Sequence, residues 1–427
     1  MQLSKNSMSK SKMTSQSVSI KKPRFIRNAL SIATSTMLAS VAPVSHAASD
    51  PTWDVDSAIL FYSETDRVTA VEPVVKVRKQ IGDDEYVGVR IVADSLSGSS
   101  ANGAIATSSA QTFTSPSGSS YTAAAGETPL DPSFHDTRIA LNGEWETPLS
   151  KAIKGFFSVN ASSEYDYESY GVAANISWDF NNRNTTLLTG LAYNNDTVKP
   201  VGGAPTGLNA MSASKTTQGS NLNKTVTDIL FGVTQVISRN TLMQFNYSHG
   251  EDDGYLTDPY KILSVLDNSG NLITGAGQYL YEKRPTTRSR NAVYWKMVHQ
   301  FSEDVLHFSY RYYWDDWGLN SNTIDARYRY ELGSGHYLQP HVRYYQQNQA
   351  DFYHYNLVDG STPQYASADY RLGDMTTTTF GIKYGIVLDK GQEFTARVES
   401  MNQSMGGSNQ GPDVDAIILQ LGYSLKF

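Results

Sequence analysis

Two groups of charged residues in this 427-residue chain have the spacing to bind anions or to form ion-pair networks. In the first group, Arg284, Arg288 and Arg290 follow one another closely, and on an extended strand Arg288 and Arg290 share one face. Guanidinium groups placed side by side can bind an anion or act as a latch on an acidic loop such as Glu251-Asp252-Asp253. The alternative, which we favour, is an inward ion-pair network. Such a network would hold the loop over the mouth of a barrel.

The second group lies on three neighbouring segments in which apolar and polar residues alternate. Its members occupy the polar positions, and they are Arg311, Asp325, Arg327, Arg329, Glu331, His341 and Arg343. If these side chains face a water-filled lumen, their mixed charges would favour polar over apolar solutes. The alternative is that they are ordinary lumen residues, paired with one another. The sequence leaves both interpretations open.

Other kinds of chemistry have little support. Without cysteine there is no disulfide framework, no thiolate metal site and no cysteine nucleophile. The acidic turn with Asp258 could bind Ca²⁺ through its oxygen atoms, but its spacing is not that of an EF-hand loop. The histidines show no metal-ligand spacing, and no residues are spaced like a catalytic triad. We therefore expect no metal site, no cofactor and no enzymatic activity.

The elements that position these residues are predicted to be long β-strands. In the last segment Ile417, Leu419, Leu421, Tyr423, Leu425 and Phe427 share one face, while polar or small residues occupy the other. Segments of about ten to fifteen residues cross a bilayer at a tilt, whereas strands of β-sandwiches are usually shorter. Because unpaired backbone groups are not tolerated in hydrocarbon, such strands must close into a barrel.

About sixteen strands are predicted, and the lengths of their connections support the count. They begin near residues 53, 70, 85, 135, 152, 168, 184, 224, 240, 287, 304, 320, 336, 370, 392 and 414. The long connections are 97–133, 197–222, 250–286, 350–369 and 404–413, and all follow odd-numbered strands. Membrane barrels have short turns at one end and long loops at the other. The prediction is therefore an all-β, antiparallel, up-and-down transmembrane barrel with long extracellular loops.

The first 47 residues have the pattern of a secretory signal peptide, with a basic leader, an apolar run from Ala29 to Val44 and small residues before Ala47. The mature chain, 48–427, would be a single barrel domain. Removing the leader leaves 28 basic residues against 42 acidic ones, and this balance argues against nucleic-acid binding. An exported barrel of this kind belongs in the outer membrane, in contact with its lipid. The aromatic C-terminal strand, with Tyr423, Leu425 and Phe427, would be the insertion signal for the barrel-assembly machinery.

Several segments resemble signatures of the bacterial outer-membrane family catalogued as domain of unknown function 3570. They are Asp94–Ala104, Gly254–Lys261, Tyr281–Arg290 and Tyr365–Gly373, and the Arg-Pro-x-x-Arg-x-Arg run from Arg284 to Arg290 is the most specific of them. The resemblance covers nearly all of the mature chain. It implies an outer-membrane barrel, and it implies no activity.

Barrels of about sixteen strands can enclose an aqueous channel, so the leading function is porin-like passage of small polar solutes through a charged lumen. The alternative is a non-conducting barrel that serves as a scaffold or docking site for a periplasmic or surface protein. The two differ in whether purified protein conducts. The sequence leaves the solute, the oligomeric state and any plug undetermined.

Overall fold

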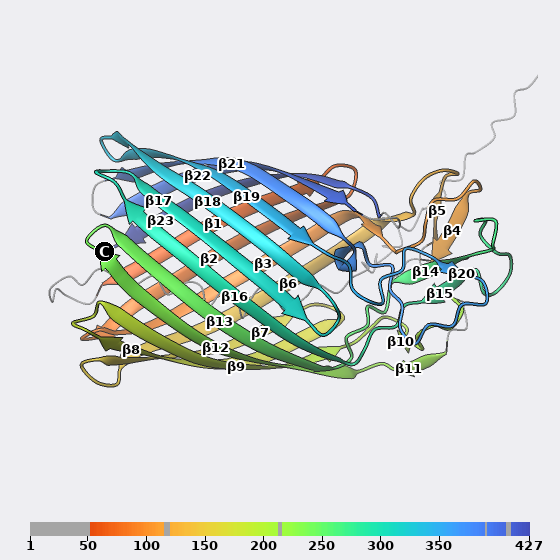
Figure 1. Cartoon of the computed structure of the whole chain (residues 1–427), viewed down its shortest axis with the longest axis horizontal. Coiled ribbons are helices and arrows are strands. Elements are labelled where there is room, and N and C mark those ends of the chain that lie inside the picture. Colours follow the sequence, from red (N-terminus) through yellow and green to blue (C-terminus); the bar gives the residue numbers. More distant parts are fainter. Residues whose placement is uncertain (1–51, 115–119, 212–215, 389–390, 407–410) are drawn as a thin grey trace, which may run out of the picture.

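The computed structural model describes residues 52–114, 120–211, 216–388, 391–406 and 411–427, and its main feature is a closed barrel of sixteen antiparallel strands (Figure 1). In barrel order the strands are β1 Trp53–Glu64, β2 Val68–Gly82, β3 Glu85–Ala101, β6 Leu130–Pro148, β7 Ile153–Ser163, β8 Tyr167–Phe180, β9 Thr185–Val198, β12 Leu222–Ser238, β13 Thr241–Gly254, β16 Thr287–Gln300, β17 Val305–Asp315, β18 Asn320–Gly333, β19 His336–Gln347, β21 Met375–Leu388, β22 Gln392–Met405 and β23 Val414–Lys426. Each strand is hydrogen-bonded to the strand before it and the strand after it in this order. Strand β1 pairs with β23, which closes the barrel.

The predicted fold class is confirmed, including the number of strands and the position of all five long connections after odd-numbered strands. The fourth and fourteenth strands differ most, since β6 begins at Leu130 rather than near 135 and β21 at Met375 rather than near 370. Residues Tyr370–Leu372 instead form a single 3₁₀ turn, η1, which the Asp369 side chain caps by accepting a hydrogen bond from the Arg371 N–H at 3.2 Å. The predicted signal peptide, 1–47, lies outside the described residues.

The barrel is apolar outside and polar inside because side chains alternate along each strand. On β23, Ile417 and Leu421 are half exposed on the outer face, whereas Gln420 lies between them on the inner face. Large exposed aromatic residues gather near the tight-turn end, namely Trp53, Trp145, Trp178, Phe301, Tyr330, Phe394 and Phe427. This distribution matches the aromatic girdle of a membrane barrel. Within the described residues, no helix is long and apolar enough to cross a membrane.

The closing seam contains the proposed insertion signal. Trp53 and Phe427 exchange two backbone hydrogen bonds, of 2.7 and 3.0 Å, at the tight-turn end of the barrel. Above them, Leu425 pairs with Val55 and Tyr423 with Ser57. The last strand therefore contributes both its backbone and its outer apolar face to the finished wall.

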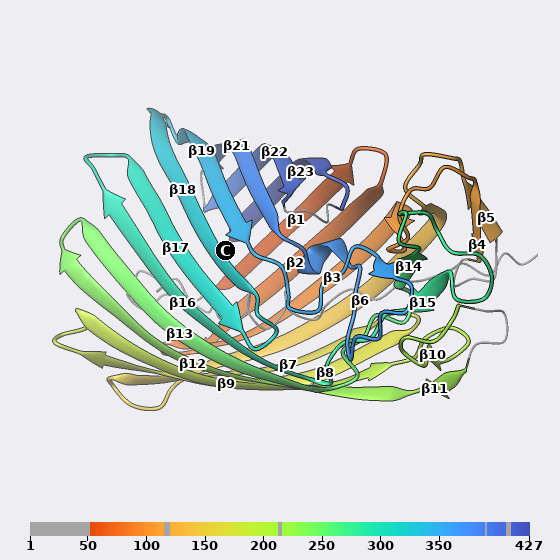
Figure 2. The same ribbon diagram turned by 45° about the vertical axis from the view of Figure 1, so that its right-hand side comes forward.

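The long loops fold together into a cap over the opposite end of the barrel, away from the C-terminus (Figures 1 and 2). Short strands strengthen it, and these are β4 Gln111–Thr114, β5 Ser120–Ala123, β10 Ala204–Pro205, β11 Thr217–Gly219, β14 Ile262–Leu266, β15 Tyr279–Tyr281 and β20 Leu357–Val358. Strand β14 is central, because it pairs with β15 and also with β20 from a loop far along the chain.

Small apolar clusters form the interior of the cap. Phe113 packs with Ile262 and Tyr279, which joins the β3–β6 loop to the β13–β16 loop. Leu263 packs with Leu357, which adds the β19–β21 loop. Residues 102–114 and 120–129, which lie between β3 and β6, are therefore part of this folded cap. The loops stabilise one another by burying apolar side chains that none could bury alone.

The barrel wall extends further than the alternation indicated. Strand β3 reaches Ala101, β6 begins at Leu130, and β13 continues to Gly254. The predicted acidic loop Glu251-Asp252-Asp253 is therefore wrong, because these residues lie in β13 and pair in register with Ser289, Arg288 and Thr287 of β16. Hydrogen bonds between strands that are far apart in the sequence but adjacent in the barrel extend the wall past the last apolar residues.

Candidate functional site: a charged lumen beneath the loop cap

The segments that carry the family resemblance come together at the base of the cap. Lys283 and Ala366 exchange two backbone hydrogen bonds of 2.9 Å, which joins Tyr281–Arg290 to Tyr365–Gly373. The Ser367 hydroxyl donates to the Glu282 carboxylate, and both residues are buried. Two stretches that are about 80 residues apart in the sequence thus lie side by side.

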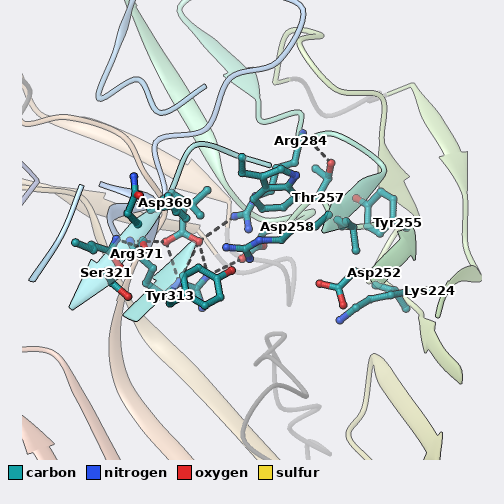
Figure 3. A pocket seen from close by; sticks show the side chains of 18 of the residues that line it. Lys224, Asp252, Tyr255, Thr257, Asp258, Arg284, Tyr313, Ser321, Asp369 and Arg371 are labelled. Carbon is teal, nitrogen blue, oxygen red and sulfur yellow. Dashed lines mark hydrogen bonds and ion pairs between the residues drawn. The ribbon is translucent and has the colours of Figure 1, made fainter. Parts of the chain in front are cut away.

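A buried ion-pair network fixes this structure over the barrel mouth. The Arg284 guanidinium donates to Asp369 at 2.9 Å and lies 2.7 Å from Glu282, and Arg371 donates to Asp369 at 2.8 Å (Figure 3). Burial opposes ionisation of Asp369, but Arg371, Lys261 and Arg284 outweigh it and hold the pKa of the Asp369 carboxyl well below its usual range. Arg284 is therefore a structural residue of the cap.

Lys261 ties the cap to the third strand. Its ammonium group is buried and donates to the backbone carbonyl of Ala101, at the end of β3. Burial lowers the pKa of Lys261, and the nearby Asp369 and Asp258 act in the opposite direction. The Ile262 N–H also donates to the Asn102 carbonyl at 2.9 Å, so the contact joins two loops at adjacent positions.

The other two arginines of the first group lie on the barrel wall, and each has its own acidic partner. Arg290 Nη2 donates to Asp252 Oδ1 at 2.8 Å and lies 3.2 Å from Asp228 Oδ1. Arg288 Nε donates to Asp315 Oδ2 at 2.9 Å, and its guanidinium stacks 4.3 Å from the ring centre of Trp317. Both arginines therefore form ion pairs within the wall, and the hypothesis that they hold a loop over the barrel mouth stays a prediction.

The acidic segment does not act as one unit. Only Asp252 points inward to an arginine, because neighbouring residues of β13 alternate between the two faces. Glu251 is exposed and lies 3.0 Å from His249 Nε2, and Asp253 is exposed as well. Within the described part of the chain, no group of three or more acidic or histidine side chains is arranged to hold a metal ion.

A cavity of about 250 Å³ lies between the cap and the upper barrel, and we call it the vestibule. Figure 3 shows the residues that line it, with the Asp369 network on one side and Lys224 and Asp252 on the other. Its basic residues are Lys224, Arg284, Arg288, Arg311 and Arg371. Tyrosines from several strands, among them Tyr167, Tyr313 and Tyr345, complete the lining. Both the cap and the wall therefore contribute to the vestibule.

A larger cavity of about 550 Å³ lies inside the barrel, and we call it the lumen cavity. Its charged lining consists of Lys296, Arg311, Asp325, Arg327, Arg343 and Lys383. Four of the residues singled out in the sequence, Arg311, Asp325, Arg327 and Arg343, lie here. Arg311 lines both cavities, so it lies between the vestibule and the lumen cavity.

The remaining residues of the second group lie on the same inner faces of β18 and β19 and form pairs. His341 bridges two carboxylates, with Nε2 at 2.8 Å from Asp325 and Nδ1 at 2.8 Å from Glu399. Arg327 Nε lies 3.2 Å from Asp325. Arg329 pairs with Glu331 and stacks 3.7 Å from the ring centre of Tyr337. The negative charges of this wall are therefore already engaged.

The opposite wall carries charges of both signs in pairs. Lys76 lies 2.7 Å from Glu144, Arg78 pairs with Glu146, and Arg138 pairs with Asp94. A third cavity of about 320 Å³ lies along this wall, and Glu72, Arg90 and Arg138 are among its lining residues. Three ion pairs thus balance charges on this wall, whereas the lining of the lumen cavity has an excess of positive charge.

Sequence reasoning missed Lys296, Lys383 and Lys224 as members of the site. The alternation already carried a signal for two of them, because Lys296 lies between Trp295 and Met297, and Lys383 between Ile382 and Tyr384. A charged residue between two large apolar ones on a membrane strand must face the lumen. Lys224 is the third residue of β12 and follows a long loop. The alternation of apolar and polar residues is not yet established there.

Comparison with known proteins gives a family. The model of the family described as "Protein of unknown function (DUF3570)" matches residues 27–425. Among solved structures, Pseudomonas aeruginosa OccK3 (OpdO) is 9% identical, with 88% of this chain and 96% of that chain covered and a TM-score of 0.40. For a bacterial polysaccharide outer membrane secretin the values are 8%, 88%, 98% and 0.42. No match was found among curated proteins.

Proposed function

The chain belongs to the protein family of unknown function DUF3570, as its signature segments indicated, and we propose that it is an outer-membrane channel for small polar solutes. The observation that carries the proposal is the position of Arg311, which lines both the vestibule and the lumen cavity. One continuous polar route beneath the cap is what a channel requires. A barrel of sixteen strands is wide enough to enclose such a route.

The cap would set the size limit of the channel. Its ion pairs and buried apolar clusters fix it over the mouth, so a solute must pass between the cap and the wall to reach Arg311. The charged inner wall would then favour polar solutes, because apolar ones gain nothing by leaving water there. Passage needs no bond to be made or broken, and the proposal assigns no catalytic residue.

The proposal also covers where the protein lies and how it arrives there. The exposed apolar belt and aromatic girdle suit the lipid of the outer membrane. Tyr423, Leu425 and Phe427 on the closing strand would be read by the barrel-assembly machinery, since they present an apolar face that ends in an exposed aromatic residue. Export would depend on the signal peptide predicted at 1–47.

Conductance of the purified, folded protein in a planar lipid bilayer tests the channel. Stable current steps whose size rises with salt concentration are expected. The folded state is checked first by its mobility shift on heating in detergent gels. An absence of current then cannot result from misfolding. A folded barrel that inserts and never conducts would refute the channel.

A scaffold is the second candidate function, and the folded cap favours it. Three buried apolar clusters give the cap a defined surface of its own, which separate flexible loops would lack. A surface or periplasmic protein could dock there. Absence of current, together with a protein that co-purifies with the wild type and is lost when the cap is cut out, would support the scaffold over the channel.

A further inference from the structure

We propose that the permeating solutes are small anions, carrying carboxylate or phosphate groups, and that one wall of the lumen binds them. The proposal rests on the channel function above and adds the class of solute. The binding surface is the basic stripe, which we define as Lys296, Arg311, Arg327, Arg343 and Lys383.

The basic stripe is built by five adjacent strands, β16, β17, β18, β19 and β21, each of which contributes one cation to the same cavity. The strand register places them close together. Arg311 pairs across the sheet with Tyr294, which precedes Lys296 by two residues, and Arg343 pairs with Asp325, two residues before Arg327. Because alternate residues share a face, all five side chains project into the lumen.

The charges on this wall do not balance. Asp325 is the single acidic residue of the lumen cavity, and it already contacts Arg327 and His341. For Lys296, Arg311, Arg343 and Lys383, no carboxylate within the described ranges lies inside the ion-pair distance of 4.0 Å. Neighbouring cations repel one another, and a bound anion relieves that repulsion.

The lining of the vestibule also indicates that Arg311 is available to bind an anion. Of its five basic residues, four have an acidic partner: Lys224 lies 3.6 Å from Asp196, Arg284 2.9 Å from Asp369, Arg288 2.9 Å from Asp315, and Arg371 2.8 Å from Asp369. Arg311 has none among the described residues, and it contacts the ring of Tyr313 at 5.5 Å. An anion that enters beneath the cap meets Arg311 first as an available cation.

The rest of the lumen cavity fits a hydroxylated anion. Asn246, Ser248, Tyr294, Ser309, Thr323 and Gln339 line it and offer neutral donors and acceptors beside the cations. Its volume of about 550 Å³ lies in the range of pockets that hold small organic molecules. Charged donors bind carboxylate and phosphate oxygens about twice as strongly as neutral donors do.

Reversal potentials across a potassium chloride gradient test the inference. The wild type is expected to prefer chloride, and the double variant R311Q/R343Q is expected to lose that preference. The matched control is R329Q/E331Q, which removes one positive and one negative charge that pair with each other and so leaves the net charge unchanged. The control should keep the wild-type reversal potential.

The nature of the anion is tested by adding gluconate, phosphate or glucose to one side of the bilayer. A fall in current with gluconate alone assigns carboxylates, a fall with phosphate alone assigns phosphates, and glucose is expected to have no effect at equal concentration. R311Q/R343Q should abolish the fall. Should that variant fail to fold, K296M/K383M tests the same stripe from its two ends.

The outcomes separate this inference from the channel itself. Absence of current from the folded wild type overturns the channel. Current with no preference for chloride, or with a preference that R311Q/R343Q and K296M/K383M leave intact, overturns the basic stripe while the channel stands. An equal response to gluconate, phosphate and glucose also overturns it.

Discussion

Arg290 and Asp252 meet on the inner wall of the barrel, where the guanidinium of one donates to the carboxylate of the other at 2.8 Å. Both side chains are buried, and Asp228 lies on the other side of the arginine. The contact is possible because Gly250 faces them. A Cβ at position 250 would lie 2.4 Å from Asp228 Oδ1 and 2.9 Å from Arg290 Nη2. The glycine therefore leaves the space that the ion pair occupies.

Replacing Arg290 by alanine should destabilise the barrel by about 3–5 kcal/mol, because the buried Asp252 and the partly buried Asp228 lose their counter-charge. Unfolding in urea, followed by tryptophan fluorescence in lipid vesicles, measures the change. The control is E251Q, since Glu251 is exposed on the outer face of the same strand. Similar unfolding midpoints for R290A and E251Q would mean that the pair adds nothing to stability.

Replacing Asp369 by asparagine should loosen the cap without unfolding the barrel. The substitution removes the negative charge shared by Arg284, whose side chain is largely buried at the base of the cap, and Arg371, whose side chain is partly exposed. Limited proteolysis should then cut within 255–286 or 348–374 faster than in the wild type. D253N serves as the control, because Asp253 is exposed. If D369N and D253N are cut at one rate, the network does not hold the cap.

Replacing Gly385 by valine should narrow the lumen. The Tyr337 ring lies against this glycine, and a Cβ there would come within 2.1 Å of the ring carbon Cζ. The ring must therefore turn inward, away from Arg329, which now stacks on it. Smaller current steps in a planar bilayer are expected. In contrast, G143A should conduct like the wild type, because its Cβ would meet only Val159 at 3.4 Å. Unchanged steps in G385V would contradict this packing.

Glu164 should make the barrel less stable as the pH rises. Burial, followed by the nearby Asp136, raises the pKa of its carboxyl to about 9 from an ordinary value of 4.5. The folded protein therefore keeps a proton that the unfolded chain releases above its own pKa. Its contribution to stability is fully present below about pH 4.5 and is lost as the pH rises toward about 9.

The E164Q variant tests this pH dependence, since glutamine cannot ionise. Urea midpoints measured from pH 5 to pH 9 should decline less steeply in E164Q than in the wild type. E168Q is the comparison, because Glu168 lies nearby and is paired with Lys199 at 2.6 Å near the surface. Parallel curves for the wild type and E164Q would show that Glu164 is ionised in the folded state.

The barrel could be predicted from the sequence because its determinants are local. The alternation from Ile417 to Phe427 distinguishes a lipid-facing from a water-facing side without knowledge of any partner. Tight turns also have local signatures, and Asn181, Asn182 and Ser334 adopt the positive φ angles that favour short turns. Strand starts near 53, 85, 287, 336, 392 and 414 follow from these two signals.

The cap and the site could not be predicted in the same way, because their contacts join distant residues. Lys261 and Ala101 are 160 residues apart, and Arg284 and Asp369 are 85 apart. No period in the sequence relates such pairs. The three residues Glu251, Asp252 and Asp253 resembled a surface loop because they are acidic. Their place in β13 depends on pairing with β16, which the sequence of β13 alone does not reveal.

The cap has a consequence for how other molecules would recognise this protein. Its surface is assembled from loops that lie far apart in the chain, and β14 pairs with β20 across that distance. An antibody raised against the folded protein would therefore read a discontinuous epitope. Such an antibody would bind weakly to synthetic peptides that copy any one loop.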